Sequence, residues 1–221
     1  MKSIILTSIL TLVSILTFAQ KNDTKPFPCK DFTKLELDGS FNVVLVKGEY
    51  CSAYAEGKTK DLEEIKMVQK GDQLSFTNIK KKEDGSNKSV NSKKSLTLYI
   101  QIVDLKEIES NLVGTLTNEG VLNFNNLKLE MNSVGATTLH FKLNHLDFEY
   151  NGIGKVELAG NAKSTNLEYS GIGSVDARDF LVKDMEVECD GIGSVKVNAS
   201  NSIKMESSGI GSLKNYGTAK E

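Results

Sequence analysis

Short runs in which apolar and polar residues alternate recur through the second half of the chain. Examples are Leu167-Glu168-Tyr169, Val175-Asp176-Ala177 and Val195-Lys196-Val197. A period of two sends successive side chains to opposite faces, which predicts short β-strands.

A seven-residue motif occurs six times among these runs: an apolar residue, Glu, a variable residue, Asn, Ser or Asp, usually Gly, then Val or Ile, and Gly. The closing glycines recur at nearly constant spacing and are Gly114, Gly135, Gly154, Gly173, Gly193 and Gly211. Two short strands and their corners fit into about 20 residues, the length of one coil of a β-solenoid. The sequence therefore predicts an all-β fold of coils of about 20 residues, stacked as parallel strands about 4.8 Å apart. Unrelated hairpins with glycine turns are the alternative, but hairpins have no reason to keep such a register.

The motif also suggests which side chains point into the coils. Ile172 and Val175 are three positions apart, so both point inward only if the chain bends between them, and Gly173 can adopt the backbone conformation of such a corner. The six glycines are thus predicted to be structural. One internal apolar ladder is then formed by Val113, Val134, Ile153, Ile172, Ile192 and Ile210. A second is formed by Leu116, Val156, Val175, Val195 and Leu213, with Thr137 as its weakest match.

The N-terminal third contains one looser copy of the motif, which we call the N-terminal echo. Residues 35–39 (Leu-Glu-Leu-Asp-Gly) match residues 187–191 (Val-Glu-Cys-Asp-Gly), and both are followed by an alternating apolar run. This match favours a single domain over two.

Residues 1–20 have the pattern of a secretory signal peptide: a basic start, an uncharged apolar middle and Ala19-Gln20 before the polar Lys21. We therefore expect an exported protein of the periplasm, the outer surface or the extracellular space, with residues 21–31 as a linker. A single β-helix domain is expected over residues 32–216, interrupted by a Lys-rich loop at 80–95 and followed by a tail at 217–221. No other segment is apolar and long enough to span a membrane.

The amino-acid composition limits the kinds of ligand-binding and catalytic site that the chain can form. The chain has 27 Lys and Arg against 29 Asp and Glu, so a broadly basic nucleic-acid binder is excluded. Arg178 is the single Arg, and there are two His and no Trp. Many phosphate-clamping and sugar-stacking sites need more Arg and Trp than this.

The stretch at residues 32–48 and the repeated Ser-Gly-Ile-Gly-Ser-Val segments resemble the putative auto-transporter adhesin head GIN domain family of secreted Bacteroidetes proteins, a domain of unknown function. The resemblance extends over residues 32–216. It implies a right-handed parallel β-helix and adds little about chemistry.

When the coils stack, the Glu at the second position of each motif copy would form a column, which is the most unusual feature of the repeat. It contains Glu109, Glu130, Glu149, Glu168, Glu188 and Glu206, with Glu36 in the echo. Apolar neighbours on both sides predict that these carboxylates face solvent, their repulsion relieved by flexibility and nearby Lys. The alternative is a weak divalent-cation strip at Glu130, Glu149, Glu168 and Glu188, since carboxylate oxygens suit Ca²⁺.

Other candidate groups are sparse. His140 and His145 lie five positions apart with no Cys nearby, a poor arrangement for zinc. Asp176, Arg178 and Asp179 form the best catalytic candidate, but such a cluster is more often a salt-bridged turn. No cofactor is indicated by any motif.

The three cysteines are an odd set for an exported protein. Cys189 shares an inward column with Tyr150 and Tyr169, so we expect a reduced, inert thiol. Cys29 and Cys51 are separated by about one coil length, which would place them within disulfide range. The competing interpretation is an irregular first coil with the two thiols apart.

Two functional hypotheses remain. The first is a non-catalytic, exported cell-envelope or surface β-helix that acts in adhesion or binds an unidentified ligand, a glycan or a protein. The second is a carbohydrate-active β-helix enzyme of the cell envelope. The lack of Trp and the scarcity of Arg favour the first.

Overall fold

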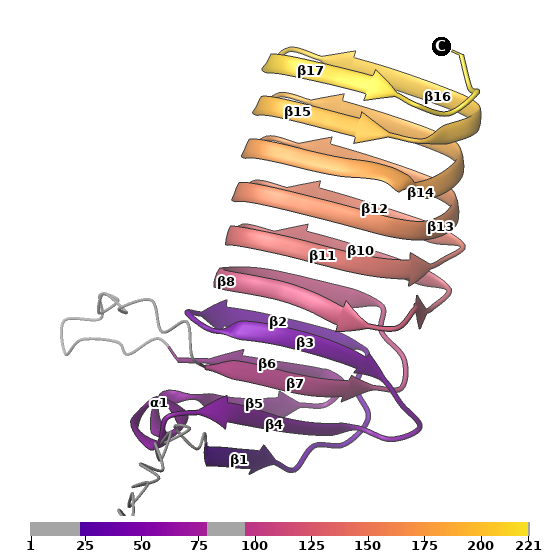
Figure 1. Cartoon of the computed structure of the whole chain (residues 1–221). Helices are drawn as coiled ribbons and strands as arrows, with labels where there is room; N and C mark the ends of the chain where they lie inside the picture. Colours follow the sequence, from indigo (N-terminus) through magenta and orange to yellow (C-terminus); the bar gives the residue numbers. More distant parts are fainter. Residues whose placement is uncertain (1–22, 79–95, 221) are drawn as a thin grey trace, which may run out of the picture.

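The computed structural model describes residues 23–78 and 96–220, and its stacked coils form a β-solenoid of about 5 turns (Figure 1). The segments expected to be a signal peptide and a Lys-rich loop lie outside the described residues. The N-terminal elements are β1 Asp23–Phe27, β2 Lys34–Gly39, β3 Asn42–Lys47, β4 Ser52–Gly57, α1 Thr59–Glu64, β5 Lys66–Lys70, β6 Gln73–Thr77 and β7 Thr97–Ile102. The remaining strands are β8 Glu107–Glu119, β9 Leu122–Asn123, β10 Asn126–Met131, β11 Val134–Lys142, β12 His145–Tyr150, β13 Ile153–Tyr169, β14 Ile172–Cys189, β15 Ile192–Val197, β16 Ala199–Ser207 and β17 Ile210–Asn215.

From β8 onward every described strand pairing is parallel, and equivalent motif residues stack in register. Ile153 of β13 pairs with Ile172 of β14, which in turn pairs with Ile192 of β15. The all-β solenoid, with one motif copy in each coil as the repeat predicted, is therefore confirmed.

The N-terminal echo is a true coil, but it stacks out of chain order. Leu35 of β2 pairs with Ile108 of β8, and Val43 of β3 pairs with Leu116. On their other side, β2 pairs with β6 and β3 with β7. The coil formed by β2 and β3 is thus enclosed between two coils that come later in the sequence.

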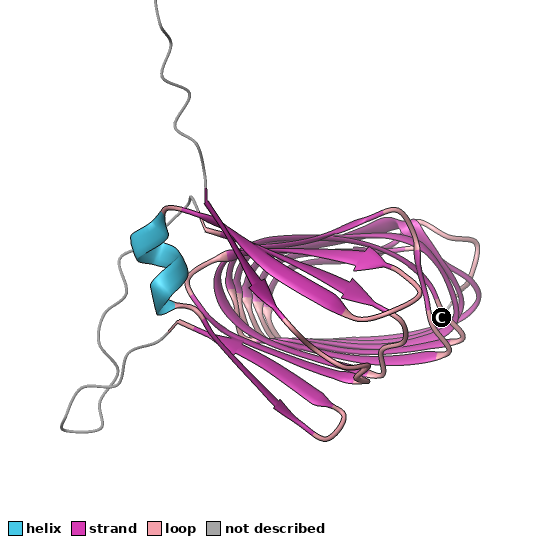
Figure 2. Cartoon of the chain, turned by 90° about the horizontal axis from the view of Figure 1, so that it is seen from below, coloured by secondary structure: helices cyan, strands magenta, loops and turns pink. Residues whose placement is uncertain are grey.

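Below β6 and β7 the parallel order gives way to antiparallel pairing. β4 runs antiparallel to both β1 and β7, and β5 forms an antiparallel hairpin with β6. Seen along the solenoid, these strands and α1 splay away from the outline of the regular coils (Figure 2). Residues 23–27, expected to belong to a linker, are β1. At the other end, the tail bonds to the last coil through the amide of Ala219 and the carbonyl of Ala199.

The interior contains one of the two predicted ladders. Leu116, Val156, Val175 and Val195 are at most 1% exposed, and Thr137 is 4% exposed. The column that includes Tyr150, Tyr169 and Cys189 is also buried. Burial of such side chains supplies the main stabilising term, about 1.5–3 kcal/mol for each large apolar residue.

The other predicted ladder is wrong: its Val and Ile side chains face solvent, between 44% exposed at Val134 and 72% at Ile210. The physical reason lies at the corner. The turn falls at Ser170-Gly171, before β14 begins, so Ile172 and Val175 belong to one strand and their side chains point to opposite faces, Ile172 outward and Val175 inward.

Gly173 is therefore needed for a reason other than a corner. Its φ is +133°, and a Cβ atom added there would lie 1.9 Å from the carbonyl oxygen of Gly154 in the preceding coil. The glycine column permits close approach of successive backbones.

Candidate functional site

An exposed aliphatic column follows one corner of the solenoid. We call it the aliphatic ridge; its members are Val113, Val134, Ile153, Ile172, Ile192 and Ile210. Their register is continuous from β8 through β11, β13, β14 and β15 to β17. Adjacent rungs lie about 4.8 Å apart, so six apolar side chains form one unbroken line.

Small side chains border the ridge. Each ridge residue is followed by a glycine, and the next position is Thr115, Ala136, Lys155, Ser174, Ser194 or Ser212. Ser194 and Ser212 share a hydrogen bond of 3.2 Å between their hydroxyl groups. Since five of the six bordering side chains are short, the ridge stands above the surface beside it.

The glutamate column is a second in-register line on the outside of the coils. Glu36, Glu109, Glu130 and Glu149 pair in succession, and the series continues through Glu168 and Glu188 to Glu206.

Hydrogen bonds and lysines relieve the mutual repulsion of this column. The side-chain amides of Asn111 and Asn151 donate to Glu109 and Glu149, each at 3.1 Å. Lys204 lies 2.6 Å from Glu186 and 2.9 Å from Glu206. Among residues 23–78 and 96–220, no group of three His, Cys, Asp or Glu is arranged to hold a metal ion. The column therefore offers carboxylates in a line, without a converging cation site in the described chain.

The negative charge of the glutamate column affects Asp38, which lies close to Glu36 and Glu109. The pKa of Asp38 is raised above its ordinary value, first by burial and then by the negative charges of Glu36 and Glu109.

A groove of about 430 Å³ lies at another corner, where β8, β10 and β12 begin. It is lined by Asp104, Leu105, Lys106, Asn125, Asn126, Leu127, Lys128, His145 and Asp147. A second hollow of about 340 Å³ shares Asp104 and Asn125 with it. We call the two together the corner groove.

Hydrogen bonds between successive turns fix the walls of the corner groove. The side-chain amide of Asn144 donates to Asn125, and both Asn144 and His145 bond through their backbone amides to the Asn125 carbonyl. His145 Nδ1 lies 2.8 Å from the Ser164 hydroxyl, while His140 lies outside the groove residues. Sequence reasoning missed this groove. The available signal was the pair of turns Phe124-Asn125-Asn126 and Leu143-Asn144-His145, each just before an alternating run.

The catalytic candidate that the sequence indicated around Arg178 is a surface salt bridge in the structure. The guanidinium donates to Asp176 through Nε at 2.8 Å and through a terminal nitrogen at 2.7 Å. This bidentate contact is the main cause that lowers the pKa of Asp176. Arg178 also lies over the ring of Tyr216, at 5.6 Å from its centroid. The arginine thus ties together the outside of the last coils.

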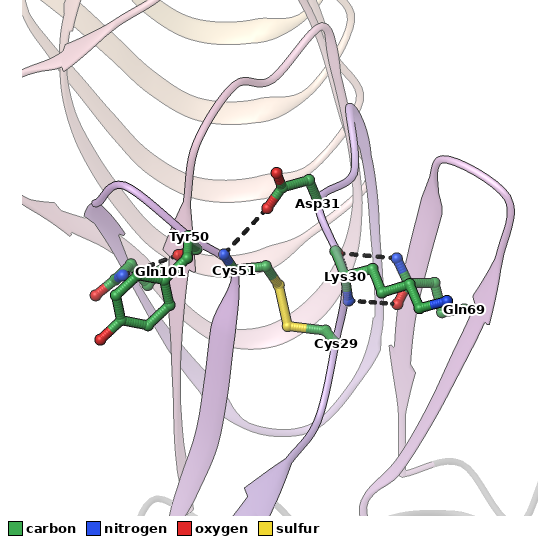
Figure 3. The surroundings of a disulfide bond; sticks show 7 residues. All are labelled: Cys29, Lys30, Asp31, Tyr50, Cys51, Gln69 and Gln101. Atoms are coloured by element: carbon green, nitrogen blue, oxygen red, sulfur yellow. Dashed lines mark hydrogen bonds between the residues drawn. A yellow bond between two sulfur atoms is a disulfide. The ribbon is translucent and has the colours of Figure 1, made fainter.

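Cys29 and Cys51 are joined by a disulfide with a Cα–Cα distance of 6.0 Å (Figure 3). The geometry differs from two stacked parallel coils. Cys29 follows β1 and Cys51 precedes β4, so the antiparallel register in which Phe27 pairs with Ala53 continues to set them opposite each other. The Cys51 amide also donates to Asp31, and Lys30 exchanges two hydrogen bonds with Gln69. Cys189 is free and buried, and burial raises the pKa of its thiol.

These features define a class: a β-solenoid of short parallel coils with a glycine column, a glutamate column and an exposed aliphatic ridge. The family model described as "Putative auto-transporter adhesin, head GIN domain" matches residues 31–219, so the chain belongs to that family.

Two solved structures share this fold. A putative adhesin from Bacteroides fragilis NCTC 9343 is 24% identical with a TM-score of 0.73, and the match covers 91% of this chain and 96% of that one. A putative lipid binding protein from Parabacteroides distasonis ATCC 8503 is 13% identical with a TM-score of 0.62, over 91% and 96% of the two chains. At these identities the likeness shows the fold alone. No curated protein matches the chain.

Proposed function

We propose that the protein is an exported, non-catalytic adhesin-type β-solenoid that binds a ligand of the cell envelope or cell surface through the aliphatic ridge. The observation that carries the proposal is the exposure of the ridge: four of its six side chains, Val113, Ile153, Ile172 and Ile192, are 45–51% exposed, in one register. Ordered, contiguous apolar surface on a protein in water marks an interaction site.

Structural need alone does not account for the ridge. The core column next to it, which includes Val175 and Val195, already fills the interior at 0% exposure. An outward side chain that served only to form a strand would function equally well as Thr, as at Thr117 and Thr138 in the same sheet. Rigid coils also hold the ridge in place before binding, which lowers the entropic cost of association.

Family membership and the N-terminal sequence support the cellular setting. The family is that of an adhesin head, and residues 1–20 have the pattern of a signal peptide. No helix in the described residues is long and apolar enough to cross a membrane. The name of the Parabacteroides relative, a lipid binding protein, agrees with a ligand that presents an apolar surface.

The test compares two triple variants of similar apolar loss. One is Ile153→Ser/Ile172→Ser/Ile192→Ser on the ridge. The control is Val68→Ser/Val121→Ser/Leu181→Ser, which removes three aliphatic side chains that are 45–58% exposed elsewhere. Binding is measured on a glycan array, on immobilised envelope proteins and on whole cells, after circular dichroism has shown that both variants are folded.

We expect the ridge variant to lose at least tenfold in affinity for whichever ligand the unmodified protein binds, and the control to keep it. Equal binding by both variants would refute the ridge as the binding surface. Export is checked separately, by fractionation of cells and by the N-terminal residue of the processed protein.

The corner groove favours the second candidate, a carbohydrate-active enzyme, because Asp104, Asp147 and His145 all line one concave surface. Polysaccharide cleavage commonly uses a pair of carboxylates. A depolymerisation assay that compares the protein with Asp104→Asn/Asp147→Asn decides between the two candidates. Cleavage that the double variant abolishes would establish the enzyme and refute the non-catalytic assignment.

A further inference from the structure

Within the part of the chain that the structure describes, the C-terminal end of the solenoid is an open coil. β16 pairs with β14 and β17 pairs with β15, and no strand among the described residues pairs with the outer side of either (Figure 1). In a parallel ladder, alternate residues direct their N–H and C=O groups to the two sides of the strand. Both strands therefore present unpaired backbone donors and acceptors, the arrangement that recruits a further strand.

The tail covers only one corner of this end. The amide of Tyr216 donates to Val197 and the amide of Ala219 to Ala199, at 2.8 and 3.0 Å. The side chain of Asn215 bonds to both the amide and the carbonyl of Ala199. These contacts lie at the start of β16, so the rest of β16 and β17 stays uncovered by the tail.

Apolar side chains of the last coil are more exposed than the equivalent side chains one coil earlier. Ile210 is 72% exposed, against 49% for Ile192 one coil earlier. Leu213 and Met205 are only partly buried, although the residues they stack on, Val195 and Val187, are at most 1% exposed. The last coil therefore carries core positions that no other described residues cover from the outer side.

The opposite end has a different shape. It consists of antiparallel strands with α1 at one side, and its β5–β6 hairpin projects outside the outline of the coils (Figure 2). Pro26 lies within the edge strand β1, and Lys66 and Lys70 lie on β5, which are features that discourage edge pairing. A second C-terminal end, in contrast, has the same cross-section as the open coil.

The edge of β16 is complementary to itself in charge. Lys204 and Glu206 both point outward and are 62% and 63% exposed, with Met205 between them. A two-fold axis through Met205 would pair two copies of β16 antiparallel and set Lys204 of each copy opposite Glu206 of the other.

We propose that two copies of this chain join end to end through β16 and β17 by antiparallel strand pairing about a two-fold axis. The contact uses the same surface on both copies, so it closes at a dimer and does not grow into a filament. The dimer would present two aliphatic ridges on one rigid rod. Its formation does not depend on which ligand the ridges bind.

The test is the mass of the exported protein in solution, by light scattering and analytical ultracentrifugation at low salt, with charge variants. We expect a dimer for the unmodified protein. Glu206→Lys sets lysines opposite lysines and should weaken the dimer at least tenfold. Glu188→Lys, in the same column one coil away from the edge, is the matched control and should leave the dissociation constant unchanged. The swap Lys204→Glu/Glu206→Lys restores the opposite charges and should restore the dimer.

A monomer at about 100 µM would overturn the proposal, as would a mass that rises beyond a dimer with concentration. A dimer that responds equally to Glu188→Lys and Glu206→Lys, or that the charge swap fails to restore, would place the interface elsewhere. Thermal unfolding of each variant separates loss of the dimer from loss of the fold.

Discussion

Single residues in this solenoid are constrained mainly by the residue one coil before them. The stacked glycines show this most directly, because the space for a Cβ atom at Gly173 is occupied by the backbone of Gly154. Tyr150 and Tyr169 stack in the same way, with ring centroids 5.6 Å apart and planes 13° apart. A substitution is thus felt by the next coil as well as by its own.

Gly173→Ala should lower the free energy of unfolding by clearly more than ~1 kcal/mol, because both the positive φ and the contact with Gly154 oppose a Cβ atom. Gly71→Ala is the matched control. Gly71 also has a positive φ, +60°, but nothing lies within 4 Å of its added Cβ, so only the conformational cost of about 1 kcal/mol remains. Urea unfolding measures both. Equal losses would show that close approach of the coils contributes nothing at Gly173.

Tyr150 should make the fold sensitive to alkaline pH. Burial first, and then Tyr169, raise its pKa to about 12. A group whose pKa is higher in the folded than in the unfolded state stabilises the fold below the unfolded value, and this contribution is lost as the pH rises between the two values.

The stability of the protein should therefore fall between about pH 10 and pH 12, and Tyr150→Phe should reduce the slope of that fall. Tyr50→Phe, at a tyrosine that is 66% exposed, is the matched control for the loss of a tyrosine hydroxyl group. Urea midpoints at several pH values test this. Identical slopes for Tyr150→Phe and the unmodified protein would contradict it.

At the scale of elements, the sequence predicted the strands that belong to repeated coils and missed the elements that occur only once. The six motif copies and the N-terminal echo established the coils because each copy constrains the register of the others. β1, α1 and the β5–β6 hairpin occur once each, and α1 is short, so no periodicity indicated them. The aliphatic ridge was placed inside because apolar character alone does not report the direction of a side chain. Strand alternation counted back from Val175 would have sent Ile172 outward.

The N-terminal elements depend on the disulfide that joins the ends of β1 and β4. In the loop-closure model, a link across this sequence separation of 22 stabilises by about 3 kcal/mol. Cys29→Ser/Cys51→Ser should lose about that much, and reduction of the unmodified protein should lose a similar amount.

The double variant is its own control for reduction, because dithiothreitol should then have no further effect on its unfolding. Mass spectrometry after alkylation without reductant checks the pairing itself. Label on both Cys29 and Cys51 in the exported protein would contradict the disulfide.

At the scale of the whole molecule, a line of seven glutamates runs along the stacked coils of the described residues. Like charges stacked at the strand spacing oppose the addition of each coil, and salt screens them. Apolar burial in every coil outweighs this repulsion, because each coil adds several large side chains to the core.

Glu168→Gln should therefore stabilise the protein at low salt by a few tenths of a kcal/mol, and the gain should vanish at about 0.5 M NaCl. Glu186→Gln removes a carboxylate outside the column that is paired with Lys204, so it should be neutral or slightly destabilising. Calorimetric titration with millimolar calcium, on the unmodified protein and on Glu149→Gln/Glu168→Gln, tests the cation strip. Heat that disappears in the double variant would show that the column does bind calcium.

The stacking of β2 and β3 against β8 has a consequence for how the chain acquires its structure in time. A chain made from the N-terminus releases β2 and β3 well before β8, so the hydrogen bond between Asn42 and Thr115, which spans a sequence separation of 73, must wait for β8. From β8 onward each coil finds its partner one repeat away, so these coils can close as soon as they emerge. Short loops close faster than long ones, and contacts distant in sequence slow folding. The half of the molecule that is synthesised last can therefore fold coil by coil. The side of the β2–β3 coil that faces β8 stays open to chaperones and proteases until β8 has been made, although β6 and β7 can cover the other side earlier.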